Sequence, residues 1–250
     1  MEANRVLTEM RGAALRVAMN RPEKKNALTL DMYERLTAAM EQAASDDAVR
    51  VLIITGAPGV FTAGNDLGDF MKSPPTGADS PVMRFLQALI GFPKPVIAAV
   101  DGPAVGIGTT MLLHCDQVIA TDRARFHMPF TRLGLVPEAA SSVLFPALVG
   151  HQRAASWLLF AQPFEPTEAK DAGLVTRIVA PSELDQVAEA LASEISRLPR
   201  EAVRLTKRLL KQGMAAAVNE ALAREGALFL ERLGSPETME ALMGFMSKRT

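Results

Sequence analysis

One stretch, 94–116 (KPVIAAVDGPAVGIGTTMLLHCD), constrains the fold of this chain more than any other. It begins with an apolar run bounded by a proline and a glycine, which is typical of a strand buried on both faces of a sheet. Two glycines, Gly106 and Gly108, then precede an apolar segment, 109–114, with the pattern of a helix. Glycines let a backbone turn sharply and approach another group closely, and free N–H groups at a helix start point outward. The stretch therefore predicts a strand, a tight turn and a helix start that together form a candidate anion-binding site.

The residues before and after this stretch alternate between strand-like and helix-like patterns. The expected strands are 6–10, 13–19, 51–55 and 116–121, and the expected helices are 29–44, capped by Thr29, and 82–90. This alternation predicts an α/β fold with parallel strands joined by right-handed crossovers. The segment 68–81 is rich in Gly, Pro, Ser and Asp, and we expect it to be mobile or to become ordered only with a ligand.

The second half of the chain has mainly helical periodicity, with one late strand expected at 175–179. The expected C-terminal helices are 184–198, 201–212, 215–233 and 236–248. Seven apolar residues in the last two helices pack either on another molecule or on the protein's own core: Leu222, Leu228, Phe229, Met239, Leu242, Met243 and Phe245. The periodicity fits both interpretations equally well.

Charge and composition exclude several classes of protein. The chain has 27 basic and 28 acidic residues, so we expect no general attraction to nucleic acid or to acidic membranes. No apolar run has the length of a bilayer span or a signal peptide, which predicts a cytoplasmic protein with no membrane partner. The single cysteine, Cys115, cannot form an intrachain disulfide, and the three histidines show no metal-ligand spacing.

Several blocks occur in an order that identifies a family. They are 61–67 (FTAGNDL), 102–106 (GPAVG), 126–130 (FHMPF) and 133–138 (LGLVPE), the last followed by the pair 141–142 (SS). Together they resemble the crotonase (enoyl-CoA hydratase/isomerase) superfamily over nearly the whole chain. Within that superfamily they are most similar to the peroxisomal-type Δ3,Δ2-enoyl-CoA isomerases.

The resemblance implies a particular α/β fold, the ββα spiral core of ClpP/crotonase-like proteins. This core is expected over residues 1–198 and carries the acyl-CoA site, while residues 199–250 form a helical oligomerisation region. Relatives use that region for trimerisation, so we expect a homotrimer or a dimer of trimers. Because CoA arrives as part of the substrate, we expect no metal or redox cofactor.

The chemistry of such a family starts with removal of a proton next to a thioester, which creates an enolate. Fixed hydrogen-bond donors must lie where that negative charge develops, and backbone N–H groups suit this role. The resemblance places the two donors at Ala63, beside Gly64, and at Ile107, between Gly106 and Gly108. The alternative is that these are only tight turns. That alternative is favoured for the second block taken alone, whereas the two blocks in this order favour a functional site.

The catalytic base is the more discriminating feature. The resemblance places the two glutamates of family hydratases at Thr110 and Phe130, and neither residue accepts a proton at neutral pH. Peroxisomal-type isomerases instead place one glutamate after the next proline, which is Glu138 here. One carboxylate suffices to remove a proton and return it elsewhere, and apolar neighbours raise its pKa. The alternative is an exposed glutamate in the first turn of a helix, where it stabilises the helix dipole.

The resemblance also assigns residues that bind the substrate. The block 64–67 contributes Gly64, Asn65, Asp66 and Leu67 to the CoA site, although Asp66 is equally explained as a turn former. Lys24, Lys25 and Lys248 are expected near the CoA phosphates. A pair of solvated charges explains Lys24 and Lys25 equally well, and a lysine in the position of Lys248 is usually just solvated. Phe130 is expected to line the acyl pocket, or else to be a core residue.

These assignments predict an enzyme of fatty acid metabolism that isomerises 3-enoyl-CoA to 2-enoyl-CoA by a Glu138-mediated 1,3-proton shift. One alternative is another acyl-CoA reaction on the same enolate, such as hydration of 2-enoyl-CoA. A second alternative, from a different class, is a non-catalytic acyl-CoA-binding protein.

Overall fold

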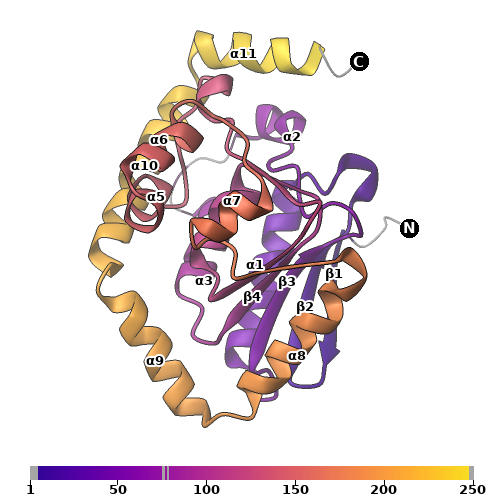
Figure 1. The fold of residues 1–250 in the computed structure, drawn as a ribbon. Helices are drawn as coiled ribbons and strands as arrows, with labels where there is room; N and C mark the ends of the chain where they lie inside the picture. Colours follow the sequence, from indigo (N-terminus) through magenta and orange to yellow (C-terminus); the bar gives the residue numbers. More distant parts are fainter. Residues whose placement is uncertain (1–4, 75–76, 78, 248–250) are drawn as a thin grey trace.

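A six-stranded sheet forms the centre of the computed structural model, which describes residues 5–74, 77 and 79–247 (Figure 1). The strands lie in the order β1-β2-β3-β4-β6-β8, with bounds Val6–Arg11, Ala14–Met19, Val51–Gly56, Val96–Val100, Gln117–Thr121 and Arg177–Val179. The β1–β2 pair is antiparallel, and every other neighbouring pair is parallel. The expected α/β fold with a parallel sheet is confirmed.

Both faces of the central strands are buried, as their continuous apolar runs predict. Alternate residues of β3 and β4 pack in two different clusters, because successive side chains of a strand point to opposite faces. One cluster includes α8 (Leu184–Ser196), and the other includes α1 (Leu30–Ser45) and α3 (Pro81–Ile90). The sheet is therefore the middle layer between helices (Figure 1).

A second sheet of two short parallel strands lies after β4. It pairs β5 (Pro103–Val105) with β7 (Arg125–His127), and an isolated bridge between Thr62 and Ala104 joins the FTAGNDL block to it. Strands of three residues are too short to produce a recognisable alternation, so the sequence pattern did not predict them. This small sheet aligns three of the family blocks side by side.

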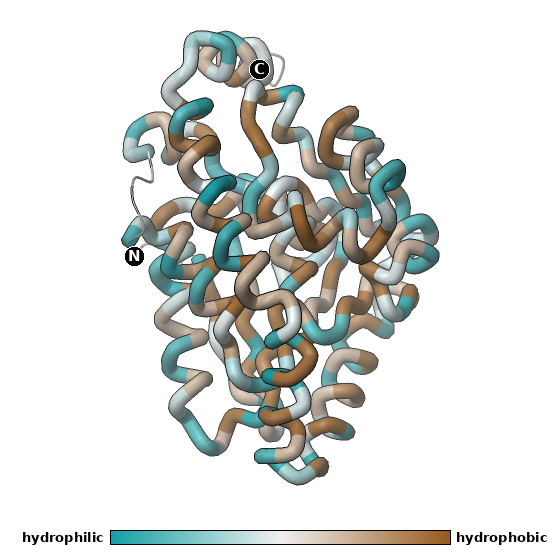
Figure 2. The backbone as a smooth tube through the Cα atoms, turned by 90° about the vertical axis from the view of Figure 1, so that its left-hand side faces the viewer, coloured by the Kyte–Doolittle hydropathy of each residue, from teal (hydrophilic) through white to brown (hydrophobic). Residues whose placement is uncertain are grey.

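Helices occupy most of the chain after β7. They are α5 (Ser141–Val149), α6 (His151–Leu158), α7 (Pro166–Asp171), α8, α9 (Arg200–Gln212), α10 (Ala215–Leu233) and α11 (Pro236–Ser247). The four expected C-terminal helices are thus confirmed within a few residues at each end. Figure 1 shows α9 leading away from the sheet, and α10 returning beside α5. In Figure 2 these helices alternate hydrophilic and hydrophobic residues along their length.

The seven apolar residues of the last two helices divide between the two interpretations. Leu222 and Leu242 are buried and cover the protein's own core, whereas Leu228 and Met243 are exposed. The side chain of Phe245 lies outside the described residues. None of the described helices is both long and apolar enough to cross a membrane.

The Gly- and Ser-rich segment contains more structure than its composition predicts. A short helix, α2 (Leu67–Lys72), begins after Asp66, whose side chain accepts a hydrogen bond from the Asp69 N–H. The hydroxyl of Ser80 caps α3 in the same way by accepting from the Met83 N–H. Part of this segment is therefore helical, because its polar residues act as N-caps.

Candidate active site

The carboxyl group of Glu138 is buried and lacks a full set of partners. Glu138 lies in the loop between β7 and α5, and only 8% of its surface is exposed. Its Oε1 atom has no hydrogen-bond partner among the described residues. A buried polar atom without a partner is costly and is therefore rare outside functional sites. The alternative of an exposed helix-start glutamate is wrong, because Glu138 precedes α5 and faces inward.

Burial changes the acidity of this group. Loss of solvation raises the pKa of Glu138 to about 8, with a further contribution from the carboxylate of Glu225. A carboxyl with such a pKa both accepts and donates a proton near neutral pH.

The turn that carries Glu138 has an unusual backbone. Ala139 and Ala140 have φ of 59° and 57°, in the left-handed region that alanine rarely adopts. Burial lowers the pKa of His114 to about 4, so its neutral ring donates from Nε2 to the carbonyl oxygen of Ala139 over 2.8 Å. The Ser141 hydroxyl donates to the Glu138 carbonyl oxygen over 2.6 Å. These contacts hold the backbone that immediately follows the Glu138 side chain.

A pocket of about 290 Å³ opens beside Glu138. Apart from Glu138, Glu225 and Ser80, its lining is apolar, with contributions from α2, α3 and α10 that include Phe70, Val82, Met83, Leu86, Leu222 and Phe229. Because α10 forms one wall, residues of the 199–250 region take part in the site. A boundary at residue 198 does not separate this pocket from the C-terminal helices.

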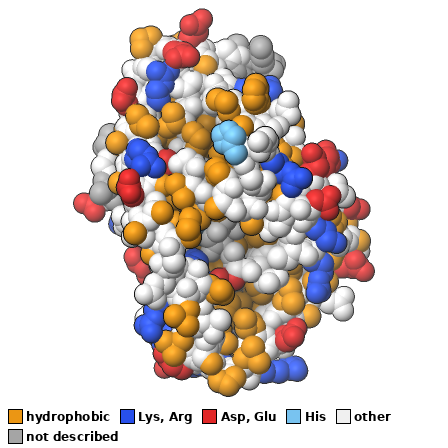
Figure 3. Space-filling view, turned by 60° about the vertical axis from the view of Figure 1, so that its left-hand side comes forward, with side chains coloured by type: hydrophobic (Ala, Val, Ile, Leu, Met, Phe, Trp, Pro, Cys, Tyr) orange, Lys and Arg blue, Asp and Glu red, His pale blue; other side chains and the backbone are white. Residues whose placement is uncertain are grey.

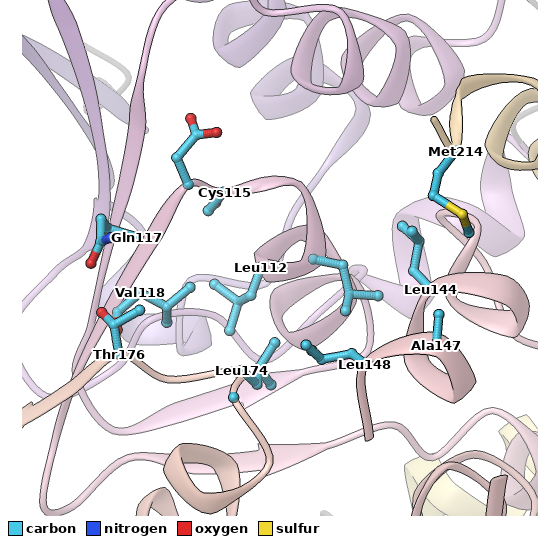
Figure 4. A pocket seen from close by; sticks show the side chains of 13 residues that line it. Leu112, Cys115, Gln117, Val118, Leu144, Ala147, Leu148, Leu174, Thr176 and Met214 are labelled. Atoms are coloured by element: carbon cyan, nitrogen blue, oxygen red, sulfur yellow. The ribbon is translucent and has the colours of Figure 1, made fainter. Parts of the chain in front are cut away.

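A second pocket, of about 340 Å³, lies between η2 (Met111–His114), β6 and α5 (Figure 4). Leucine side chains surround it, and its possible nucleophile, Cys115, is unreactive because burial raises the thiol pKa to about 12. The carboxylate of Asp116 already accepts from Lys207 and from the Val96 amide. This pocket therefore offers no group for catalysis.

The two glycine blocks meet closely, as the sequence predicts. A Cβ atom on Gly64 would lie 2.7 Å from the carbonyl oxygen of Val105, and one on Gly108 would lie 2.5 Å from a methyl carbon of Thr62. Gly64 also has φ of 86°, which strains any residue with a side chain. The glycines are required because the backbones of the two blocks are in contact.

The structure corrects one of the two proposed donors. The Ala63 N–H already donates to the carbonyl oxygen of Lys25 over 2.9 Å, so it is not available to a ligand. The Leu28 N–H donates to the Gly64 carbonyl oxygen, and the Leu28 carbonyl oxygen accepts from the Asp66 N–H, as in a parallel bridge. The N–H of Asn65, between these two residues, therefore points away from Leu28.

Within the part of the chain that the structure describes, no acceptor contacts the N–H of Asn65. The same is true of Ile107, whose N–H has no acceptor because it is the first residue of α4 (Ile107–Thr110). The available pair of donors is therefore Asn65 and Ile107.

One residue of this site, Tyr33 in α1, was missed from the sequence. Its hydroxyl donates to Oδ1 of Asn65. Burial raises the pKa of Tyr33 well above its ordinary value, and the charge of Glu138 adds to this effect. Tyr33 thus orients the Asn65 side chain and lies within the electrostatic influence of Glu138. It is the only tyrosine of the chain, but on an amphipathic helix it looks like any core residue.

The remaining predicted residues occupy several different positions. Lys24 and Lys25 are exposed at the end of the short helix η1 (Pro22–Lys24), and Lys248 lies outside the described residues. Phe130 is buried, and its ring lies 3.9 Å from where a Cβ of Gly106 would be.

The side chain of Asp66 is occupied by structural contacts. Burial acts to raise its pKa, but hydrogen bonds from Arg21 (2.6 Å) and from backbone amides outweigh this effect and hold the pKa below its ordinary value. Since the same carboxylate caps α2, the turn-forming role is the one that its described contacts support.

Comparison with known proteins agrees with this architecture. The profile of the enoyl-CoA hydratase/isomerase family matches residues 9–250. Enoyl-CoA delta isomerase 2 from Rattus norvegicus is 34% identical over 99% of this chain, which spans only 65% of that relative's length. Short-chain-enoyl-CoA hydratase from Clostridium acetobutylicum is also 34% identical, over 100% of this chain and 97% of the relative.

The fold is also that of solved structures. The structure of Pseudomonas aeruginosa OdaA has a TM-score of 0.95 and 44% identity, and the match covers 98% of this chain and 99% of that one. The fold and the site thus define a member of the crotonase superfamily. The chain belongs to its enoyl-CoA hydratase/isomerase family.

Proposed function

We propose that the protein isomerises 3-enoyl-CoA to 2-enoyl-CoA with Glu138 as its single acid–base group. The observation that carries this proposal is one buried carboxyl with an unpartnered oxygen, facing a largely apolar pocket. Isomerisation needs one group that takes a proton and returns it, and a raised pKa suits both steps.

The proposed reaction has two proton transfers. The Glu138 carboxylate removes a proton from C2, and the electron pair moves toward the thioester oxygen to form a dienolate. The N–H groups of Asn65 and Ile107 stabilise the negative oxygen. The protonated Glu138 then donates the same proton to C4, and the double bond comes to lie between C2 and C3.

The pocket walls supply the remaining proposed contacts. The apolar lining from α2, α3 and α10 receives the acyl chain, and burial of that chain keeps water away from the dienolate. Lys24, Lys25 and Lys248 remain proposed partners of the CoA phosphates. No metal or redox group is required by this scheme.

Hydration of 2-enoyl-CoA is the second candidate, because one relative at 34% identity is named a hydratase. Two observations favour isomerisation over hydration. The hydratase glutamate positions hold Thr110 and Phe130, which do not activate water. The other carboxylate of the pocket, Glu225, already accepts backbone hydrogen bonds on both of its oxygens.

The test is a paired assay of the wild-type protein and Glu138→Gln with 3-enoyl-CoA and 2-enoyl-CoA. We expect conjugation of 3-enoyl-CoA by the wild type, a loss of about 10²-fold or more in the variant, and little hydration. Unchanged thermal unfolding and CoA binding serve as the folding control. Full turnover by Glu138→Gln contradicts the proposal, and CoA binding without turnover in the wild type supports the non-catalytic alternative.

A further inference from the structure

A second buried carboxylate faces Glu138 from a distant part of the chain. Glu225 lies in α10, 85 residues from Ala140, and is only 5% exposed. Both residues line the same pocket. Charged residues are seldom buried without partners, so the contacts of Glu225 indicate its role.

Those partners are the free N–H groups at the start of α5. Oε2 of Glu225 accepts from the Ala140 N–H over 2.7 Å, and Oε1 accepts from the Ser142 N–H over 2.9 Å. The N-cap position of α5 is Ala140, which has no side-chain oxygen to supply this contact. Glu225 therefore caps α5 from another helix, and its carboxylate lies at the positive end of the helix dipole.

The capped turn is the one that carries Glu138. Ala139 and Ala140 adopt left-handed backbone angles that are strained for a residue with a side chain, so outside contacts must hold them. The His114 ring supplies one of these contacts from η2, and Glu225 supplies two from α10.

The charges around Glu138 are few and can be named. Glu225 faces it from α10 and Tyr33 faces it from α1, while the neutral His114 contacts the adjacent carbonyl. Among the described ion pairs, none joins Glu138 or Glu225 to a lysine or arginine. The negative charge of Glu225 therefore acts on Glu138 without a nearby cation to offset it.

We propose that Glu225 is a positioning residue for Glu138: Glu225 fixes the 138–142 turn and places a negative charge beside the Glu138 carboxyl. This inference rests on the proposed role of Glu138. In this proposal Glu138 carries the proton, and the negative charge of Glu225 increases the proton affinity of Glu138.

The first test measures protonation of Glu138 without any turnover. Infrared difference spectra between the wild type and Glu138→Gln identify the carbonyl band of the protonated acid, which is then followed against pH. We expect Glu225→Gln to move the disappearance of this band to lower pH. Each half unit of such a shift raises the ionised fraction about threefold at pH values below the pKa. The Glu225→Asp variant keeps the charge and should stay close to the wild type.

Two further variants separate the charge from the fold. Glu220→Gln removes an exposed carboxylate from the same helix and should leave the band unchanged. Where Glu225→Gln alone does not fold, it is made together with Ala140→Gly, because glycine adopts the left-handed angle freely and is an acceptable N-cap. An unshifted band in folded Glu225→Gln, or in the double variant against Ala140→Gly, overturns the inference.

The second test is the pH profile of kcat/KM with 3-enoyl-CoA. The acidic limb should move to lower pH in Glu225→Gln, which a purely structural cap would not produce. If the wild type shows no turnover but the infrared shift is present, the proposed function fails while this inference stands. If Glu138→Gln is inactive, but Glu225→Gln shifts neither the infrared band nor the acidic limb of kcat/KM, the inference fails while the proposed function stands.

Discussion

At the scale of single residues, the site depends on where hydrogen bonds are absent. The N–H groups of Asn65 and Ile107 and the Oε1 atom of Glu138 have no described partner, although buried polar groups normally have one. The resemblance identified Glu138 and Ile107 because both lie in recognisable blocks. It misassigned Ala63, because the carbonyl that occupies its N–H belongs to Lys25, far away in the chain. Partners of this kind follow from the folded backbone and not from local pattern.

One prediction at this scale concerns the stability cost of burying Glu138. The pKa of Glu138 in the folded protein, about 8, lies above its ordinary value of 4.5. The unfolded chain therefore loses the proton near pH 4.5 while the folded protein keeps it, so this group's contribution to stability falls as pH rises to about 8.

We therefore expect Glu138→Gln to gain stability over the wild type, on the order of 4 kcal/mol, between pH 4.5 and pH 8. Chemical unfolding of both proteins across this range measures the difference. Comparison of the two removes the effects of all other titrating groups. A difference that stays constant with pH would show that Glu138 titrates normally.

At the scale of elements, the sequence pattern was sufficient wherever an element is long or apolar. The runs in β3 and β4 predicted strands buried on both faces, and the amphipathic helices of the second half were predicted within a few residues. The pattern was insufficient for β5 and β7, because each strand has only three residues and the two strands pair with each other. It was also insufficient for the contact between α10 and the Glu138 turn, because Glu225 looks like one more polar residue of an amphipathic helix.

The close approach of the two glycine blocks leads to a prediction with a matched control. Gly64 and Gly12 both have positive φ, at 86° and 59°, but only Gly64 has an atom within 4 Å of a new Cβ. Gly12→Ala should cost about 1 kcal/mol of stability through backbone strain and leave turnover intact.

Gly64→Ala should cost several times more, or else displace the block from β5 and abolish turnover, because its Cβ would meet the Val105 carbonyl oxygen. Thermal unfolding and the isomerase assay of both variants provide the measurement. Equal effects of the two substitutions would contradict the inferred contact.

At the scale of the whole molecule, α9 buries little of its surface against its own chain, because Lys207 is its single buried residue. Two lysines fasten it: the buried Lys207 donates to the Lys94 carbonyl oxygen (2.7 Å) and to Asp116 (2.6 Å), and the half-buried Lys211 donates to the carbonyl oxygens of Ile90 and His114. Leu209 and Leu210 of the same helix are exposed, with 69% and 78% of their surface accessible. Figure 3 shows apolar side chains gathered on the side of the molecule that carries α9 and α10.

This exposure supports the expected assembly of several copies. We expect Leu209→Glu combined with Leu210→Glu to reduce the molecular mass in solution to that of the single chain, 26.9 kDa, with the fold retained. Light scattering coupled to size exclusion gives the mass, and circular dichroism checks the fold. Leu7→Glu, at an exposed leucine of β1, is the control. An unchanged mass in the double variant would place the contact elsewhere.

The contribution of α10 to the pocket also has a consequence for folding during synthesis. The ribosome makes Glu138 well before Glu225. In the intervening time, the turn after Glu138 lacks the contacts with Glu225, and the Glu138 side chain lacks the apolar residues that α10 contributes to the pocket. A nascent chain that ends before α10 contains all six strands of the central sheet but lacks one wall of the pocket beside Glu138. The proposed activity therefore requires α10 to be in place.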